Sequence, residues 1–401
     1  MLAALVLAAS CSSPPNAHRG GPVAGRPVLG AFGPGVFIAG VSSDPWAAVG
    51  WTDGPDAGAQ PATACFLSPS GAGTGPWRAC GLTPIDSDGS RTRLLSVARV
   101  GATLIAGGVA VGALHGNPRP YLWAGPLDGP LQELNLPREL FGGERIISFQ
   151  GLTSGPVGGV AVGTWDGVTN QSVAQVWLTT DGSDWRRLDG FPALTATSQE
   201  VVAGQAVAAG QSRVVVVGTV IDLARLGDGS DGAVWWSDDG TSWSRADVSG
   251  AAMGGPEDQS LTVVGAVAGT AGFVAGGTDG SGSAAMWSSP DGRVWRRAAP
   301  LPFGRGAGAT ITAVASTSGG GAGGGGGAGG LQEWAAGVVA GSPYLWRSTD
   351  GRTWIRESLP GIDLQASGPA QAVLLAAGQG SLLVVVRGTR GSSAAVLPAG
   401  P

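Results

Sequence analysis

The sequence contains no lysine and little charge of either sign. All 23 of its basic residues are arginine, and only 13% of its 401 residues are charged. With a net charge of −5, the chain has no excess of basic side chains to neutralise phosphate groups. We therefore expect neither nucleic acid nor anionic lipid headgroups as partners.

Histidine is also scarce, which limits metal and catalytic sites. The only two histidines are His18 and His115, too few for a histidine-based zinc site and a poor supply for a Ser-His-Asp triad. Two Asp-containing turns, at 86–88 and 228–231, lack the distal glutamate that completes a calcium loop. We predict no metal site and no cofactor.

Long apolar runs are absent after the N-terminus, so no transmembrane helix is expected in the body of the chain. Residues 2–10, LAALVLAAS, precede Cys11 and resemble a bacterial lipoprotein leader, although the basic start of such leaders is missing. The resemblance implies a signal peptide at 1–11, with Cys11 lipidated, and a location on the outer face of the cytoplasmic membrane or secretion. The alternative is a frayed apolar terminus. Residues 12–27 read as a flexible tether.

Cysteine is rare as well, with Cys65 and Cys80 remaining once Cys11 is assigned to lipid. The segment ATACFLSPSGAGTGPWRACGL can fold as a hairpin that sets Ser68 opposite Trp77. The same register sets the two cysteines opposite each other, so we predict a cross-strand disulfide between them.

A repeat dominates what the sequence does contain. Four segments align without gaps: VWLTTDGSDWRRL, VWWSDDGTSWSRA, MWSSPDGRVWRRA and LWRSTDGRTWIRE. Each reads W-x-[ST]-x-D-G-x-x-W, and successive copies lie 52 to 59 residues apart. The turn aspartates are Asp181, Asp239, Asp291 and Asp350, and the tryptophans that follow them are Trp185, Trp243, Trp295 and Trp354.

Short apolar strands with glycine boundaries precede each copy, which indicates four strands per repeat and a β-propeller. The expected fold is all-β, a seven-bladed propeller over 28–401. Six full blades are expected at 36–84, 94–138, 145–193, 198–249, 258–302 and 308–360. Residues 370–398 supply three strands of a seventh blade, and we expect Val28–Phe32 to supply the fourth and close the ring.

The repeat resembles the Asp-box, or bacterial neuraminidase repeat, of sialidase-like propellers, with a turn one residue shorter. In that family the motif is structural and lies away from the catalytic face. A sialidase needs three arginines, a tyrosine nucleophile assisted by a glutamate, and an acid/base aspartate. The only tyrosines, Tyr121 and Tyr344, occupy equivalent repeat positions and are typical of packing residues. The resemblance therefore implies the propeller fold but does not imply sialidase activity.

In sialidase-like propellers the active site lies on the face formed by the loops that join second to third strands and neighbouring blades. These loops are long here, so the resemblance implies binding residues on them. The candidates are Trp51, Asp53, His115, Trp165, Asp166, Asn170, Asp222, Arg225 and Asp228. We predict a monomeric extracytoplasmic binding or scaffold module, non-catalytic, that presents these loops to a protein or glycan partner. Two alternatives remain: a glycan-processing hydrolase with an unrecognised carboxylate pair, and an assembly factor for an extracytoplasmic complex.

Overall fold

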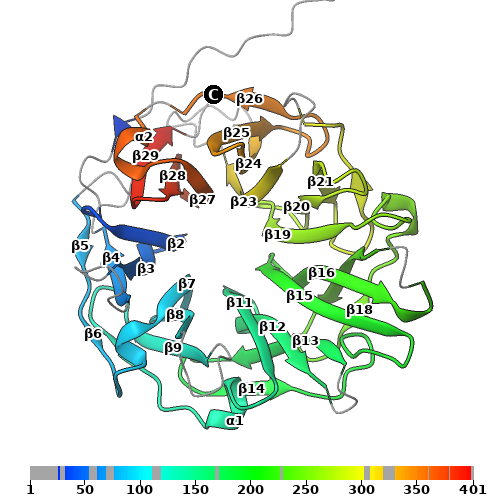
Figure 1. Ribbon diagram of the computed structural model, residues 1–401, viewed down its shortest axis with the longest axis horizontal. Coiled ribbons are helices and arrows are strands. Elements are labelled where there is room, and N and C mark those ends of the chain that lie inside the picture. Colours follow the sequence, from blue (N-terminus) through cyan, green and yellow to red (C-terminus); the bar gives the residue numbers. More distant parts are fainter. Residues whose placement is uncertain are drawn as a thin grey trace, which may run out of the picture.

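Seven β-sheets stand around a central axis in the computed structural model of the chain (Figure 1). The structure describes residues 26–27, 32–53, 61–68, 76–110, 119–167, 171–225, 229–301, 308–318, 330–359, 361–378 and 380–398. The first strand of each sheet lies nearest the axis, and neighbouring first strands contact one another all the way round. The predicted seven-bladed propeller is confirmed.

The first three blades follow one another along the chain. Blade 1 contains β2 (Val36–Ser43), β3 (Trp46–Thr52), β4 (Ala62–Leu67) and β5 (Arg78–Ala79). Blade 2 contains β7 (Arg93–Val100), β8 (Thr103–Ala110), β9 (Arg119–Pro126), β10 (Leu131–Glu133) and an extra edge strand, β6 (Leu82–Thr83). Blade 3 contains β11 (Ile146–Gly155), β12 (Gly158–Asp166), β13 (Ser172–Thr179) and β14 (Trp185–Leu188).

The remaining blades repeat the same meander. Blade 4 contains β15 (Glu200–Ala209), β16 (Val214–Asp222), β17 (Asp231–Ser237) and β18 (Ser244–Arg245). Blade 5 contains β19 (Ser260–Ala266), β20 (Phe273–Thr278), β21 (Ala284–Ser289) and β22 (Arg296–Arg297). Blade 6 contains β23 (Ala309–Ser318), β24 (Leu331–Val339), β25 (Ser342–Ser348) and β26 (Ile355–Glu357).

Blade 7 combines both ends of the described chain. It contains β27 (Ala370–Gly378), β28 (Ser381–Gly388), β29 (Ser392–Pro398) and β1 (Arg26–Pro27). Short helices occupy some connections: α1 (Arg138–Phe141), α2 (Leu364–Ser367), η1 (Gly89–Arg91), η2 (Leu223–Arg225) and η3 (Ser249–Ala251).

The ring closes as predicted, but with a different strand from the one expected. Arg26 and Pro27 pair antiparallel with Val396 and Ala395. The pairing residues described lie just before the expected donor, Val28–Phe32; of that donor, 28–31 lie outside the described residues, and Phe32 is buried near the seam without belonging to a strand. Arg26 and Pro27 lie inside the segment 12–27 that the sequence predicts to be tether.

A second correction concerns the boundary between the first two blades. Residues 82–84 were expected to end blade 1, yet Leu82 and Thr83 pair in parallel with Leu131 and Gln132 of blade 2. A two-residue strand carries no alternating pattern, and parallel pairing on an outer edge is set by the path of the connection. Blade 2 consequently has five strands.

Each blade carries a β-bulge in its first strand, and the facing residue of the second strand is always glycine. The bulged residue is left unpaired, which bends the first strand toward its neighbour. A Cβ atom on any of these glycines would overlap a backbone carbonyl oxygen, which belongs to the same blade in six cases and to Ser367 of α2 in the case of Gly388. The seven positions are Gly50, Gly108, Gly163, Gly218, Gly277, Gly337 and Gly388. They end the glycine-bounded apolar runs that the sequence shows.

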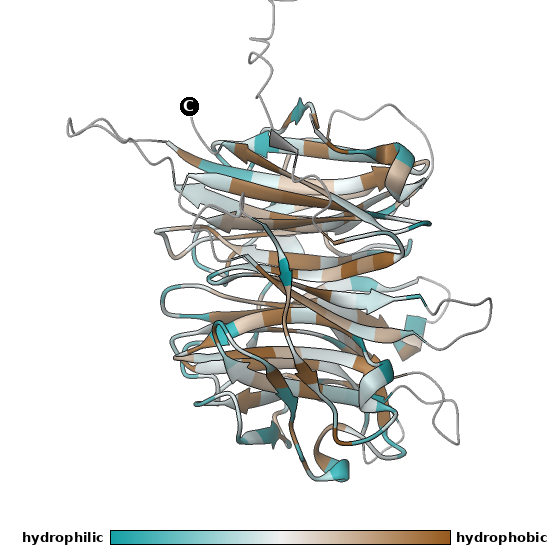
Figure 2. Cartoon of the chain, turned by 90° about the vertical axis from the view of Figure 1, so that its left-hand side faces the viewer, coloured by the Kyte–Doolittle hydropathy of each residue, from teal (hydrophilic) through white to brown (hydrophobic). Residues whose placement is uncertain are grey.

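Tryptophans fill the space between blades. In the third strands, Trp177, Trp235 and Trp287 are at most 1% exposed and pack in clusters that also hold residues of the preceding blade. Indole rings bury more area than other side chains, so they stabilise the packing of adjacent sheets. Figure 2 shows the hydrophobic residues along the stacked strands and the hydrophilic ones mainly in the turns.

The D-G turns fold as the repeat predicts, and we call the four of them the Asp turns. Asp239 Oδ1 accepts hydrogen bonds from the N–H groups of Thr241 and Ser242 at 2.7 and 2.6 Å. Gly240 has φ +73°, and its carbonyl accepts the indole N–H of Trp243 at 3.1 Å. The same carboxylate-to-amide contacts recur around Asp181, Asp291 and Asp350.

The predicted disulfide is confirmed. Cys65 and Cys80 are bonded, with their Cα atoms 5.4 Å apart. Phe66 pairs with Ala79 in the adjacent register, which is the hairpin expected from the sequence. Blade 1, whose fourth strand is only two residues long, is thus held covalently.

Candidate functional site

The two ends of the propeller differ in character. First strands begin, and second-to-third-strand loops lie, at one end, which we call the loop face; the Asp turns lie at the other. The predicted binding loops and the Asp turns therefore stand on opposite faces. Of the nine predicted binding residues, His115, Asn170 and Asp228 lie outside the described residues.

Trp51 lies in blade 1 between side chains from both neighbouring blades. Its ring stacks with Phe37 at 5.7 Å, and the guanidinium groups of Arg93 and Arg387 stand 5.3 and 5.5 Å from it. Asp53 is exposed and donates its backbone N–H to Gly35. Both arginines pair through their backbones in strands, but within the described chain neither guanidinium group forms a hydrogen bond or an ion pair.

Arg387 is unusual for its position. It precedes the bulge glycine of blade 7, where the other blades carry only aliphatic residues or glycine. Burial lowers the pKa of its guanidinium, and its Nε has no partner. The equivalent residues are Val49, Gly107, Val162, Val217, Gly276 and Ala336.

In blade 4 the predicted residues bind one another. Arg225 Nε donates to Asp222 at 2.9 Å, and a second nitrogen of Arg225 lies 3.6 Å from Asp231. The side chain of Asp222 also accepts the N–H of Ala224, and the hydrogen bond from Arg225 lowers the pKa of the Asp222 carboxyl. This cluster caps η2 and is already internally satisfied.

Trp165, by contrast, lines a cavity of about 620 Å³ on the loop face of blade 3, next to α1. We call it the blade-3 pocket. Its floor is apolar, whereas its rim carries both signs of charge. The floor includes Trp165, Val173, Leu188, Phe191 and Leu194, and the rim includes Glu139, Glu144, Arg145, Arg187 and Asp189. Asp166, the neighbour of Trp165, donates its N–H to the carbonyl of Arg145.

Arg187, one of the two arginines on the rim of this pocket, is held in place by several contacts. The guanidinium of Arg187 lies 4.5 Å above the Trp165 ring and donates to both carboxylate oxygens of Asp189, at 2.8 and 3.1 Å. A third bond reaches the carbonyl of Glu139 at 2.9 Å. Trp165 is only 7% exposed under this cover. Arg187 is therefore fixed over the Trp165 ring by these contacts.

Gln175 is the one buried polar residue that lines the blade-3 pocket. It is 3% exposed, and its amide nitrogen donates to the carbonyls of Val176 and Leu188 at 3.1 and 2.7 Å. Both amide hydrogens are thus used, and no group in the described chain donates to Oε1. This oxygen is not one of the fully buried atoms that lack a partner, so it is open to the cavity and can accept a donor from a ligand there.

Sequence reasoning missed Gln175, although the repeat contains the signal. Two residues before the first tryptophan, the copies carry Tyr121, Gln175, Ala233, Ala285 and Tyr344. In the structure this position faces the bulge glycine, at the loop-face end of the third strand. Two of these five residues, Gln175 and Tyr121, line a cavity.

Tyr121 lines a neighbouring cavity of about 250 Å³, which we call the blade-2 pocket and which shares Gly142 with the blade-3 pocket. Arg119 donates to the Tyr121 hydroxyl and to Asp88, each at 3.3 Å. Glu133 accepts the N–H of Ile85 at 2.7 Å, and burial raises the pKa of its carboxyl. The site combines a tyrosine, an arginine and a partly buried glutamate.

The central channel is divided in the middle by seven aliphatic side chains, one from each blade. We call them the aliphatic ring: Val41, Val97, Leu152, Val207, Val264, Val314 and Leu375. A chamber of about 600 Å³ lies on the Asp-turn side and one of about 330 Å³ on the loop side. Asp44 and Arg99 form an ion pair in the first, at 2.9 Å. Neither chamber holds a carboxylate pair among its described lining residues.

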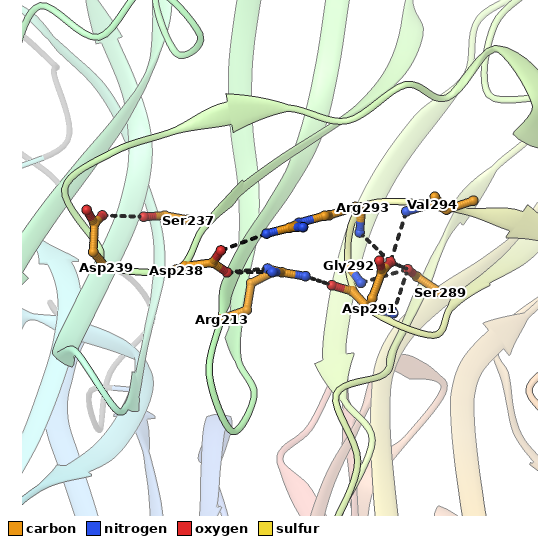
Figure 3. A network of polar contacts seen from close by, with 9 residues as sticks. All are labelled: Arg213, Ser237, Asp238, Asp239, Ser289, Asp291, Gly292, Arg293 and Val294. Atoms are coloured by element: carbon orange, nitrogen blue, oxygen red, sulfur yellow. Dashed lines mark hydrogen bonds and ion pairs between the residues drawn. The ribbon is translucent and has the colours of Figure 1, made fainter.

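A polar network on the Asp-turn face joins blades 4 and 5 (Figure 3). Asp238 accepts from Arg213 at 2.6 Å and from Arg293 at 2.7 Å, and Arg213 also donates to the Asp291 carbonyl. Both guanidinium groups lie over Trp236, at 4.9 and 4.2 Å. Every charge is paired, so the network ties blades together and offers no free group to a ligand.

Two further observations bear on the kind of protein. In the ranges that the structure describes, no three His, Cys, Asp or Glu side chains gather closely enough to hold a metal ion. No helix of those ranges is long and apolar enough to span a membrane.

No family model matches the sequence, and no curated protein matches it. Among solved structures, the chain is similar to a Trypanosoma rangeli sialidase in complex with the inhibitor DANA, at 11% identity and a TM-score of 0.44. The match covers 81% of this chain and 56% of the sialidase chain, so this chain spans little more than half of that protein.

Two other similar structures are of closer length. A protein of unknown function from Dyadobacter fermentans is 12% identical, with a TM-score of 0.45, and 76% and 93% of the two chains are covered. A mutant Aleuria aurantia lectin in complex with alpha-methyl-L-fucoside is 14% identical, with a TM-score of 0.43 and coverage of 76% and 94%. The likeness is one of fold alone.

Proposed function

We propose that this chain is a non-catalytic binding module that takes a glycan in the blade-3 pocket. The proposal is carried by Gln175, a residue 3% exposed that lines a cavity on the loop face, with its amide nitrogen fixed by two backbone carbonyls and its amide oxygen accepting no hydrogen bond from the described chain. Sugar hydroxyls are donors of the kind that this oxygen can accept at the cavity surface.

The rest of the pocket suits a sugar. Its volume of about 620 Å³ falls within the roughly 300–1,000 Å³ range of ligand sites. The apolar floor can pack against the C–H face of a sugar ring, while rim carboxylates and Arg145 can reach its hydroxyls. Because Gln175 and Arg187 are held by backbone and ion-pair contacts, little side-chain entropy is lost on binding.

The exposure of the rim supports binding over catalysis. A glycan hydrolase needs one carboxyl that burial keeps protonated beside another that stays ionised. Glu139, Glu144 and Asp189 are all exposed, and Asp189 is engaged by Arg187. These side chains fit ligand contacts better than acid/base roles.

A glycan array followed by calorimetric titration of the purified chain tests the proposal. We expect saturable binding of at least one glycan, weakened about tenfold or more by Gln175→Leu because an amide hydrogen bond is lost. The matched control is Gln132→Leu, at an exposed residue of β10, which should bind as the unaltered chain does. The proposal fails if no glycan binds, or if Gln175→Leu binds unchanged.

A second candidate, a glycan-processing hydrolase, is supported by the blade-2 pocket. Glu133 has a carboxyl of raised pKa there and lines the cavity with Asp86 and Arg119. Incubation of the bound glycans with the chain separates the candidates. Product release that stops in Glu133→Gln would favour the hydrolase, and unchanged glycans would favour the binding module.

We propose further that the chain acts outside the cytoplasm, anchored through Cys11. The Cys65–Cys80 disulfide supports the compartment, because such bonds persist in oxidising surroundings. Cys11 itself lies outside the described residues. In a bacterial host, Cys11→Ser should move the chain from the membrane fraction to the soluble fraction; no change in fractionation would contradict the anchor.

A further inference from the structure

The loop-side chamber of the central channel is built from the bulges of the inner strands. The unpaired bulge residues Leu95, Gln150, Gln205, Thr262 and Thr312 all line it. Bulges re-aim a side chain that a regular strand would direct elsewhere. Four neighbouring blades, 3 to 6, thus present an amide or a hydroxyl at the same level of the channel.

Two of these groups have unused hydrogen-bonding capacity. Gln150 donates to Ser148 at 3.1 Å, which leaves its acceptor oxygen free within the described chain. The amide of Gln205 forms no hydrogen bond there at all. Thr312, by comparison, both donates to and accepts from the backbone of Val373. The free capacity is concentrated on the adjacent blades 3 and 4.

The chamber also selects against charge. Its lining residues include no Asp, Glu, Arg or His, and its floor is the aliphatic ring. A charged group entering it would lose water without gaining a counter-charge, which is costly. An uncharged molecule with hydroxyl or amide groups on one side and C–H groups on the other would be matched by both surfaces.

We propose that the loop-side chamber is a second binding site, which holds one neutral, hydroxyl-rich ring of about monosaccharide size. Its volume of about 330 Å³ lies near the lower end of the roughly 300–1,000 Å³ range of ligand sites. The Gln150 and Gln205 amides, which can donate and accept, bind adjacent hydroxyl groups, and the aliphatic ring packs against the opposite face. This site is separate from the blade-3 pocket and does not depend on it.

Ligand-observed NMR on the intact chain provides the test. The probes are galactose and N-acetylglucosamine, with galacturonate and glucosamine as their charged counterparts. We expect the neutral sugars to bind at millimolar concentration, and the charged ones to bind about tenfold more weakly or not at all. Gln150→Leu combined with Gln205→Leu should weaken neutral-sugar binding about tenfold or more.

The variants are chosen so that folding is preserved and the two sites are distinguished. Leucine already occupies the bulge position of blade 2, as Leu95. Gln371→Leu is the matched control, since Gln371 is the bulge residue of blade 7, is exposed, and does not line the chamber. Gln175→Leu should leave the chamber's affinity unchanged.

Three results would overturn the inference. One is the absence of any neutral-sugar binding; another is equal binding of charged and neutral probes. The third is binding that survives the double variant but disappears in Gln175→Leu, which places the sugar in the blade-3 pocket and leaves the proposed function standing. Conversely, Gln175→Leu could leave the binding of array glycans unchanged while the chamber still binds neutral sugars. That result would contradict the proposed function and leave this inference standing.

Discussion

Glu333 places a carboxyl group in blade 6 at a position where blades 4 and 5 have apolar side chains. It pairs with Ser348 beside the Asp turn of blade 6, the position that Val214 and Phe273 occupy in blades 4 and 5. The residue is 6% exposed, and its Oε2 has no partner in the described structure. Burial, with a smaller effect of Asp350, raises the pKa of this carboxyl to about 7.

This side chain predicts an unusual pH dependence. Since the folded pKa lies above the unfolded value of 4.5, the native state binds more protons between these two values. Stability from Glu333 is therefore fully present below about pH 4.5 and is lost as pH rises through 7. The loss should amount to about 3 kcal/mol, because one pKa unit corresponds to about 1.4 kcal/mol.

Denaturant unfolding at about pH 5 and about pH 8 measures the effect. We expect Glu333→Gln to remove most of the difference in free energy of unfolding between the two conditions. Glu357→Gln, which alters a carboxylate paired with Arg347 in the same blade, is the comparison. Equal pH dependence in the unaltered chain and Glu333→Gln would contradict the prediction.

At the scale of the strand, the bulge glycines impose the strictest sequence requirement in the fold. A Cβ on Gly218 would overlap the carbonyl oxygen of Ala203 on the facing strand. We expect Gly218→Ala to lower the free energy of unfolding by about 3 kcal/mol or more, because backbone on both sides must move.

Gly250→Ala is the matched control, as a Cβ there meets nothing within 4 Å. Thermal and denaturant unfolding compare the two variants. A Gly218→Ala chain as stable as Gly250→Ala would show that the bulge does not depend on the close approach.

Two adjacent aspartates in one of the Asp turns, Asp238 and Asp239, should differ in their contribution to stability. Asp239 accepts two backbone amides, whereas Asp238 forms exposed ion pairs with Arg213 and Arg293. We expect Asp239→Ala to cost about 1–2 kcal/mol of unfolding free energy and Asp238→Ala less than about 1 kcal/mol.

The pH dependence of the unfolding free energy should also distinguish Asp239 from Asp238. Hydrogen bonds from the backbone lower the pKa of the Asp239 carboxyl, so its contribution is present above its unfolded value of 3.8 and lost as pH falls below it. Unfolding curves of both variants under neutral and acid conditions test this. An Asp238→Ala chain that is less stable than Asp239→Ala would reverse the assignment.

Repeated features were predictable from the sequence, and single departures from the repeat were not. The D-G turns, the tryptophan pairs and the Cys65–Cys80 register each follow from spacing that recurs or is symmetric. Strands β1 and β6 are two residues long, so no alternation could place them. Gln175 and Gln205 lie in apolar strands, where a lone polar residue gains meaning only once its neighbours across the blade are known.

At the scale of the whole molecule, ring closure rests on one short strand. Arg26 and Pro27 cover the edge of β29, which would otherwise be an exposed strand edge open to other chains. A chain truncated to start at residue 29 should unfold at lower temperature and aggregate. A chain that starts at residue 21 keeps β1 and should match the full chain; equal stability of both truncations would contradict this role of β1.

We propose, for the molecule as a whole, that a closed, seven-bladed scaffold presents the Gln175 amide oxygen to a glycan on the loop face. The most direct measurement is a crystal structure of the chain with the tightest glycan from the array. We predict the sugar in the blade-3 pocket, with one hydroxyl group donating to Gln175 Oε1. A glycan bound on the Asp-turn face, or bound in the blade-3 pocket with no contact to Gln175, would contradict the account.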